Sequence, residues 1–155
     1  MSRPATRIAA LAIVVLTLTG CFGGDVETRT EDEAKALVRD RSAQLATQLG
    51  GVAFTEAKEN PGPCTSGGNA DVFAVQGSYQ APLPTAEQIP TLNRIRDAWK
   101  RDGWEITDDR VIEPNAGILR AKSSDGYTYH LTSARSTTEL GVIIYSPCFE
   151  SPTPR

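Results

Sequence analysis

The sequence predicts an α+β fold, in which two helices pack on one antiparallel sheet of about five strands. Two segments carry apolar residues at the three- and four-residue spacing of an amphipathic helix, and five others have the patterns of strands bounded by turns. Their order is helix, strand, helix and then four strands, which is typical of α+β rather than of alternating α/β folds. The chain has 155 residues, a length that suits one domain.

The first helix is expected over residues 30–49. Thr30 and Glu33 have the spacing of a capping box, in which each side chain accepts a hydrogen bond from the other residue's free backbone N–H. One face of the segment is apolar, at Ala34, Leu37, Val38, Leu45, Ala46 and Leu49. Gly50 and Gly51 end the helix, because glycine is the usual residue beyond a helix C-terminus.

A loop and the first strand follow. The loop is expected over 59–69, where prolines and glycines surround Cys64. Residues 71–79 alternate apolar and polar side chains, which predicts a half-buried strand.

The second helix is expected over residues 85–102. Thr85 and Gln88 have the spacing of a second capping box, and Gly103 ends the segment. Pro90 lies deeper than the first turn, where proline is tolerated, so a start near Pro90 is the alternative.

Four more strands are expected to form a meander. They are predicted over residues 104–112, 118–122, 127–133 and 140–145. The connections are short, and the Ser-Ser-Asp-Gly sequence at 123–126 is typical of a tight hairpin. Connections of this length can join antiparallel neighbours.

The N-terminus has the organisation of an export signal. Residues 1–7 carry two arginines and no acid, and residues 8–19 form an uncharged run that is too short to span a bilayer. The sequence Leu-Thr-Gly-Cys at 18–21 follows, and it resembles the lipobox of bacterial lipoproteins. The resemblance implies that the Cys21 thiol receives a diacylglycerol, that residues 1–20 are removed, and that the protein is held at the outer face of the cytoplasmic membrane. An ordinary secretory signal with a chance cysteine is the alternative.

The mature chain is expected to comprise a flexible tether at 21–29, one domain at 30–150 and a disordered tail at 151–155. The whole chain has a net charge of −3, and loss of Arg3 and Arg7 with the signal leaves 14 basic and 19 acidic side chains. Nucleic-acid binding requires clustered cations, and no such cluster survives cleavage, so we exclude that class. Membrane attachment is expected to come from the lipid.

Cysteine usage predicts one disulfide. Of the three cysteines, Cys21 is assigned to lipid, which leaves Cys64 and Cys148 to pair. Export permits a disulfide, and closure of so long a loop stabilises by about 4–5 kcal/mol in the chain-entropy model. A redox-active pair is the alternative, although the chain has no Cys-x-x-Cys sequence. The disulfide would bring the first and last strands together, and as neighbours they would run antiparallel.

His130 is the single histidine of the chain. By strand alternation it shares a solvent face with Thr128 and Thr132, while Tyr127 and Tyr129 share the opposite face. A zinc site lacks ligands, and a Ser/His/Asp triad lacks a nucleophile-elbow motif. We expect the two tyrosines to lie under a helix; a ligand-binding surface of Tyr127, Tyr129 and His130 is the alternative.

Asp108, Asp109 and Glu113 are the closest approach to a carboxylate pair. An envelope hydrolase would need two such groups facing one cleft. Because adjacent strand residues point to opposite faces, an ordinary polar hairpin is the preferred explanation.

The order of elements also indicates a family. A lipobox precedes a helix, a Pro-Cys loop, a second helix ending in Trp-Lys-Arg-Asp-Gly-Trp at 99–104, a meander and Ser-Pro-Cys at 146–148. This layout resembles the small exported lipoproteins of actinomycetes, including LppA-like families. The resemblance implies a location and a fold, because most such families have no assigned activity.

The function expected from the sequence is that of a lipid-anchored binding or interaction module of the cell envelope. An envelope protein, a peptidoglycan fragment or a small lipid is the expected partner. We expect no cofactor, no metal and no enzymatic activity, and we expect a monomer.

Overall fold

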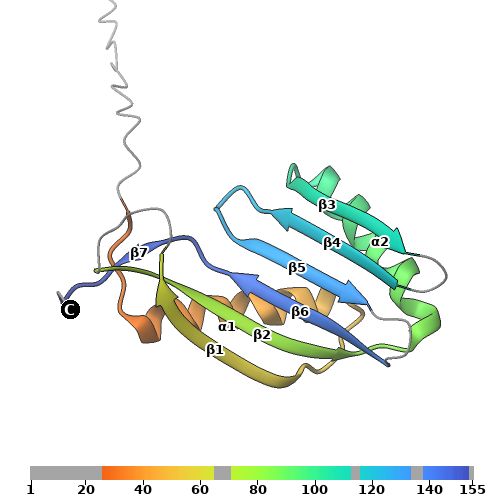
Figure 1. The fold of residues 1–155 in the computed structure, drawn as a ribbon, viewed down its shortest axis with the longest axis horizontal. Helices are drawn as coiled ribbons and strands as arrows, with labels where there is room; N and C mark the ends of the chain where they lie inside the picture. The colour runs from red at the N-terminus through yellow and green to blue at the C-terminus, as the bar shows by residue number, and fades with distance from the viewer. Residues whose placement is uncertain (1–25, 65–70, 113–115, 134–137, 154–155) are drawn as a thin grey trace, which may run out of the picture.

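The computed structural model describes residues 26–64, 71–112, 116–133 and 138–153. They form two helices and a seven-stranded sheet whose neighbouring strands are all antiparallel (Figure 1). In chain order the elements are α1 (Glu31–Gln48), β1 (Thr55–Pro63), β2 (Val72–Pro82), α2 (Thr85–Arg101), β3 (Glu105–Ile112), β4 (Ala116–Lys122), β5 (Thr128–Ser133), β6 (Glu139–Tyr145) and β7 (Phe149–Glu150). The sheet order is β1-β2-β6-β5-β4-β3, and β7 pairs with the start of β2. The predicted α+β class is confirmed.

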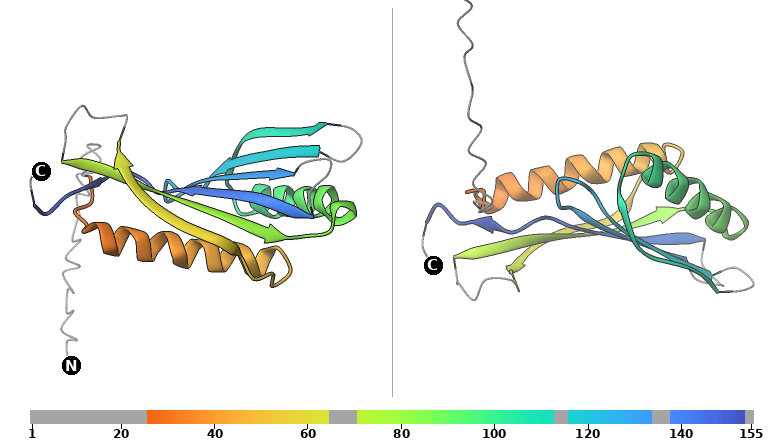
Figure 2. Two further views of the ribbon diagram at one scale, coloured as in Figure 1. Left: turned by 60° about the horizontal axis from the view of Figure 1, so that its bottom comes forward. Right: turned by 90° about the horizontal axis from the view of Figure 1, so that it is seen from above.

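The molecule has two layers, with both helices on one face of the sheet (Figure 2). α1 packs against β1, β2 and β6, and α2 packs against β3, β4 and β5. A Cβ atom at Gly77 of β2 would meet Val38 of α1, and one at Gly117 of β4 would meet Ile89 and Leu92 of α2. Neither of the two described helices covers the other face of the sheet.

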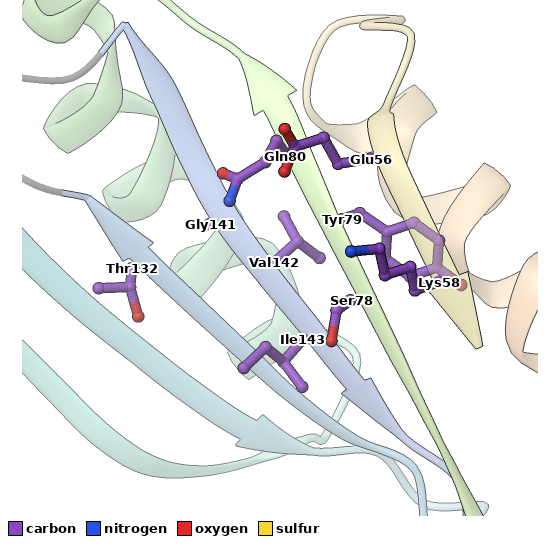
Figure 3. Close-up of a pocket in the computed structure, with 9 residues that line it drawn as sticks. All are labelled: Glu56, Lys58, Ser78, Tyr79, Gln80, Thr132, Gly141, Val142 and Ile143. Carbon is purple, nitrogen blue, oxygen red and sulfur yellow. The ribbon is translucent and has the colours of Figure 1, made fainter. Parts of the chain in front are cut away.

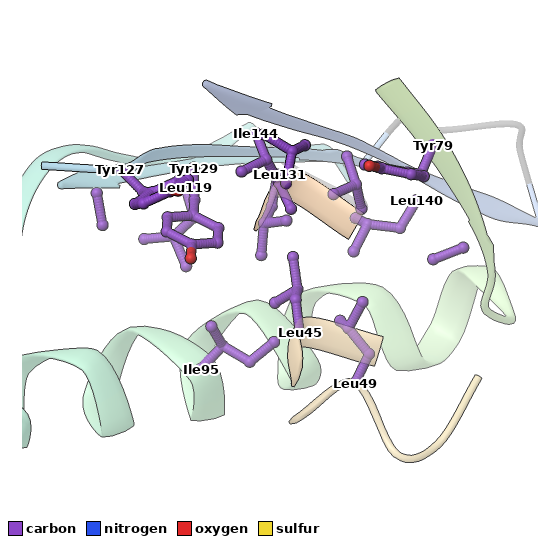
Figure 4. Close-up of a cluster of buried hydrophobic side chains, with 14 of the residues drawn as sticks. Leu45, Leu49, Tyr79, Ile95, Leu119, Tyr127, Tyr129, Leu131, Leu140 and Ile144 are labelled. Atoms are coloured by element: carbon purple, nitrogen blue, oxygen red, sulfur yellow. The ribbon is translucent and has the colours of Figure 1, made fainter. Parts of the chain in front are cut away.

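The core lies between the helices and the sheet. Leu45 of α1 and Ile95 of α2 point toward the sheet, whose Leu131 and Ile144 point back toward them (Figure 4). All four side chains are at most 2% exposed, so the predicted apolar stripes are the buried faces.

The indole of Trp99 connects the two helices. It is fully buried in α2, stacks on Trp104 with ring centroids 4.8 Å apart, and donates its N–H to Oε1 of Gln48 at 3.0 Å. The polar atom of this large side chain is thus satisfied by the last residue of α1.

The two helices begin differently. Thr30 caps α1 with the predicted capping box, in which Oγ1 of Thr30 accepts from the N–H of Glu33 at 3.2 Å. The second predicted capping box is wrong, because Pro84 is the N-cap residue of α2 and makes no side-chain cap. The Gln88 amide is instead fully buried and donates to the carbonyl of Leu83 at 3.0 Å. α2 starts at Thr85 and contains Pro90 in its interior.

The expected number of strands is wrong: the sheet has seven strands, not about five. β1 occupies the beginning of the segment predicted as a loop at 59–69 and is an edge strand that pairs with β2 alone. An edge strand tolerates Pro61 and Pro63, because the missing N–H groups are not needed on its free side. β7 is only two residues long, too short to give a sequence pattern.

β2 and β6, the strands that the sequence predicts as the first and the last, are neighbours, as the cysteine pairing suggested. Cys64 and Cys148 form a disulfide, and β2 pairs with β6 in antiparallel register, with Ser78 opposite Ile143. Between β6 and β7, the Oγ of Ser146 accepts from the N–H of Val75 at 2.9 Å. This side chain satisfies a β2 donor at the point where the last strand is interrupted.

The chain enters the domain beside β7. The N–H of Arg29 donates to the carbonyl of Glu150 at 2.9 Å, and the N–H of Glu150 donates to the carbonyl of Glu27 at 3.0 Å. Residues 27–29, which we assigned to the tether, are therefore hydrogen-bonded to the sheet. The start of the predicted tail lies against the same end, since the N–H of Ser151 donates to the carbonyl of Asp71.

Two glycines on opposite faces of the sheet test this packing. A Cβ atom at Gly77 would lie 2.6 Å from Cγ1 of Val38, whereas at Gly141 the nearest atom would be the Thr132 carbonyl oxygen at 3.6 Å. We expect Gly77→Ala to lower the free energy of unfolding by about 1–3 kcal/mol through overpacking. Gly141→Ala, the matched control, should change it by about 0.5 kcal/mol or less. Chemical denaturation measures both, and equal stability of the two variants would contradict the contact between α1 and β2.

Candidate functional site

The candidate site lies on the face of the sheet that no helix covers. Along β2, buried residues alternate with half-buried ones, and Gly77 in the buried set faces α1. The alternate residues Ala74, Gln76, Ser78 and Gln80 therefore face away from the helices. Gln76, Ser78 and Gln80 are half-buried because β1 flanks them on one side and β6 on the other.

The first hollow on this face has a volume of about 270 Å³ and lies over Gly141 of β6 (Figure 3). Four strands supply the rest of its lining: Glu56 and Lys58 of β1, Ser78, Tyr79 and Gln80 of β2, Val142 and Ile143 of β6, and Thr132 of β5. In the register of the sheet, Gly141 lies between Gln80 and Thr132. Because glycine has no side chain, the hollow exists at this point.

Glu56 at the rim of this hollow has an unusual backbone conformation. Its φ of 53° lies in the left-handed region. In the described part of the chain, Glu56 is the one non-glycine residue with a positive φ. The pairing of β1 with β2 also shifts register between Thr55 and Lys58. Bulges and left-handed residues redirect side chains and are frequent next to binding sites. The Glu56 side chain lines the hollow together with Gln80 (Figure 3).

A second hollow, of about 260 Å³, lies further along the same face. Asn60 and Gly62 of β1, Ala74 and Gln76 of β2, and Tyr145 of β6 contribute to its lining. The two hollows follow one another along β2, and Gln76 Nε2 donates to Ser78 Oγ at 3.1 Å where they meet. We call the two hollows together the β2 trough.

His130 lies on the face of the trough, next to it. It is half-buried, its ring meets that of Tyr145 edge-on at 5.2 Å, and Ile143 is its β6 partner. Burial lowers the pKa of His130, the Arg120 guanidinium lowers it further, and Asp108 opposes this effect.

Tyr127 and Tyr129 lie on the opposite face, so the structure does not bring them together with His130. Their side chains are 4% and 3% exposed, and the Tyr129 ring packs against Trp104 with centroids 4.9 Å apart. Burial raises the pKa of Tyr129 to about 12. The Arg41 guanidinium lies 4.9 Å from the centre of the Tyr127 ring. Both tyrosines are part of the core, as the alternation suggested.

Asp108 and Asp109 bind different arginines. Both carboxylate oxygens of Asp108 accept from Arg110 at 2.8 Å, while Asp109 accepts from Arg96 of α2 at 3.3 Å. The hydrogen bonds from Arg110 lower the pKa of Asp108, whereas a general acid needs a raised pKa. The geometry does not support a shared acid–base site of these two residues, and Glu113 lies outside the described residues.

Among the described residues, no group of three or more His, Cys, Asp or Glu side chains could hold a metal ion. None of their helices is long and apolar enough to cross a membrane. Cys21, the predicted lipidation site, lies outside these residues.

The β2 trough is not predicted by the sequence. Its lining combines residues from 56–62, 74–80 and 141–145, which become neighbours only through the register of the sheet. One signal was available, because Gly141 interrupts the most apolar strand pattern of the chain.

The chain is similar to a known protein in fold but not in sequence. No protein-family model matches it, and no curated protein matches it. Among solved structures, it is similar to the crystal structure of LppA from Mycobacterium tuberculosis, a protein assigned as a lipoprotein. The TM-score is 0.50, the sequence identity is 12%, and the match covers 79% of each chain. At this level of sequence identity, the likeness shows that the two proteins share a fold, and it shows nothing about a shared function.

The His130 environment predicts a pH effect. We expect its imidazole to titrate below the ordinary pKa of 6.5 in an NMR titration, because burial disfavours the charged form. The pKa of His130 is then lower in the folded than in the unfolded protein. This pKa difference contributes to the free energy of unfolding above about pH 6.5, and the contribution is lost as the pH falls from about 6.5 through the lower pKa of the folded state. Arg120→Gln should raise the midpoint, whereas Lys122→Gln on the same strand should leave it unchanged. A wild-type midpoint above 6.5 would contradict the burial of His130.

Proposed function

We propose that this protein is a lipid-anchored, extracytoplasmic lipoprotein that acts as a binding module of the cell envelope. In this proposal Cys21 carries the lipid and the β2 trough carries the ligand. The observation that bears most weight is the coincidence of three features at one hollow: the Gly141 floor, the left-handed Glu56 and the register shift of β1. Features of this kind cost stability, so their convergence favours a binding role.

Three further observations support the proposal. The lipobox-like sequence ends at Cys21, and the first hydrogen bond described between the N-terminal segment and the sheet is at Glu27. The Cys64–Cys148 disulfide suits an oxidising compartment. The fold is shared with a protein assigned as a lipoprotein.

Anchoring is tested by replacing the proposed lipidation site. In a bacterial host with a lipoprotein pathway, we expect the wild-type chain to partition into the detergent phase and to carry a diacylglyceryl group at Cys21 by mass spectrometry. Cys21→Ser should remain in the aqueous phase, since the acyl chains supply the membrane affinity. Cys64→Ser is the control, because it removes a cysteine but not the proposed anchor. Detergent partitioning of Cys21→Ser would refute the anchor.

Binding through the trough is tested by site-specific photo-crosslinking in intact cells. A photoreactive residue at Thr132, an exposed position of the trough, is expected to form adducts with an envelope component. The same residue at Ala43, which is exposed on α1, is the control and should give at most background. Adducts from Ala43 but not from Thr132 would place the binding surface on the helices and contradict the proposal.

A further inference from the structure

The backbone in the floor of the β2 trough is already fully paired. Gln76, Ser78 and Gln80 each have a partner in β1 on one side and a partner in β6 on the other. Their main-chain groups are therefore used within the sheet, and a ligand here cannot be bound as an added strand. Recognition in the trough depends on side chains.

Apart from Glu56 and Lys58, the polar side chains that line the trough are neutral and able to form hydrogen bonds. Asn60, Gln76, Ser78, Gln80 and Thr132 each offer a donor and an acceptor. Such groups match a ligand that carries many hydroxyl or amide groups, because these also donate and accept. The hydrogen bond from Gln76 to Ser78 shows that neighbouring side chains are aligned along the trough.

The charges at the trough argue for an uncharged ligand. Of its lining residues, Glu56 and Lys58 carry charges, of opposite sign, and both line the Gly141 hollow. The lining as a whole therefore has no net charge. A polyanion or a polycation would find no complementary field along this surface.

The shape of the trough suits a chain with flat, partly apolar units. Tyr145 offers a half-buried aromatic ring in the second hollow, and Ile143 adds an apolar group in the first. An aromatic ring with a polar tip can contact the C–H face of a sugar while leaving its hydroxyls free. From Ala74 to Gln80 the trough extends for about 20 Å along β2, which is long enough for an oligomer.

We propose that the β2 trough binds an uncharged oligosaccharide chain, with Gln76 and Gln80 as the hydrogen-bonding side chains of its floor and Tyr145 as its stacking residue. This inference rests on the proposed function, and it specifies the class of ligand. Glu56 and Lys58 then close the trough at the Gly141 end.

The test uses the full chain in detergent micelles and a β-1,4-linked N-acetylglucosamine tetramer as the probe. Because His130 is the single histidine and adjoins Tyr145, its imidazole NMR signals report on this face alone. We expect a saturable shift of these signals at up to millimolar tetramer. Gln76→Ala combined with Gln80→Ala should weaken the binding by about tenfold or more, since two hydrogen-bonding groups are lost. Gln44→Ala, an exposed amide on α1, is the matched control and should bind as the wild type does.

A second variant guards against misfolding of the first. Gly141→Leu fills the first hollow from a position with room for a Cβ atom, and it should also weaken binding while circular dichroism stays native. No shift of His130 with the tetramer would overturn the proposal, as would an equal shift in the double glutamine variant. A shift with a neutral alanine–serine peptide but not with the tetramer would overturn it in favour of a peptide ligand. Each of these failures leaves the crosslinks from Thr132 intact, so failure of the ligand class is distinguishable from failure of the proposed function.

Discussion

The pairing of β2 with its neighbours on both edges is the constraint on which the rest of the structure depends. β2 has eleven residues and pairs with β1 along one edge and with β6 and β7 along the other. With both edges occupied, its side chains can only point to the two faces of the sheet, in strict alternation. Phe73, Val75 and Tyr79 on one face are covered by the helices, and Gln76, Ser78 and Gln80 on the other form the floor of the trough. One residue of slip between β2 and β6 would exchange these two sets.

The sequence predicts those elements whose burial creates a periodic pattern. α1, β2, β5 and β6 each bury one face, so their apolar residues recur at the period of the helix or the strand, and their bounds are predicted to within a few residues. β1 has exposed positions along most of its length and therefore lacks such a pattern. The start of α2 was predicted with the wrong chemistry for a different reason. Gln88 has the spacing of a capping residue, but its side chain is buried in the core, where its amide donates a hydrogen bond to the carbonyl of Leu83.

The site was less predictable than the fold, because it depends on contacts between distant parts of the chain. Alternation within one strand places His130 on the open face and Tyr127 on the core face, and this needs no knowledge of neighbouring strands. The β2 trough instead requires that Gly141 lie beside Gln80 and that Glu56 reach the same point from β1. The register of β1 includes a shift, which no local pattern in the sequence indicates. The sequence therefore predicts that His130 lies on the open face of the sheet, but not that the β2 trough lies beside it.

The proposed anchor and the Gly141 hollow of the trough lie at opposite ends of β2. Glu27, β7 and the disulfide all lie at its start, while the Gly141 hollow lies near its end. Five residues lie between Cys21 and Glu27, so an extended chain spans at most about 20–22 Å between them. Under the proposed anchoring, the covalently joined end of the sheet is the end held near the bilayer, and any pull on the lipid acts on strands that the disulfide ties together. The Gly141 hollow then lies at the end of β2 that is farther from the anchor, on the side of the envelope polymers that we propose as its ligand.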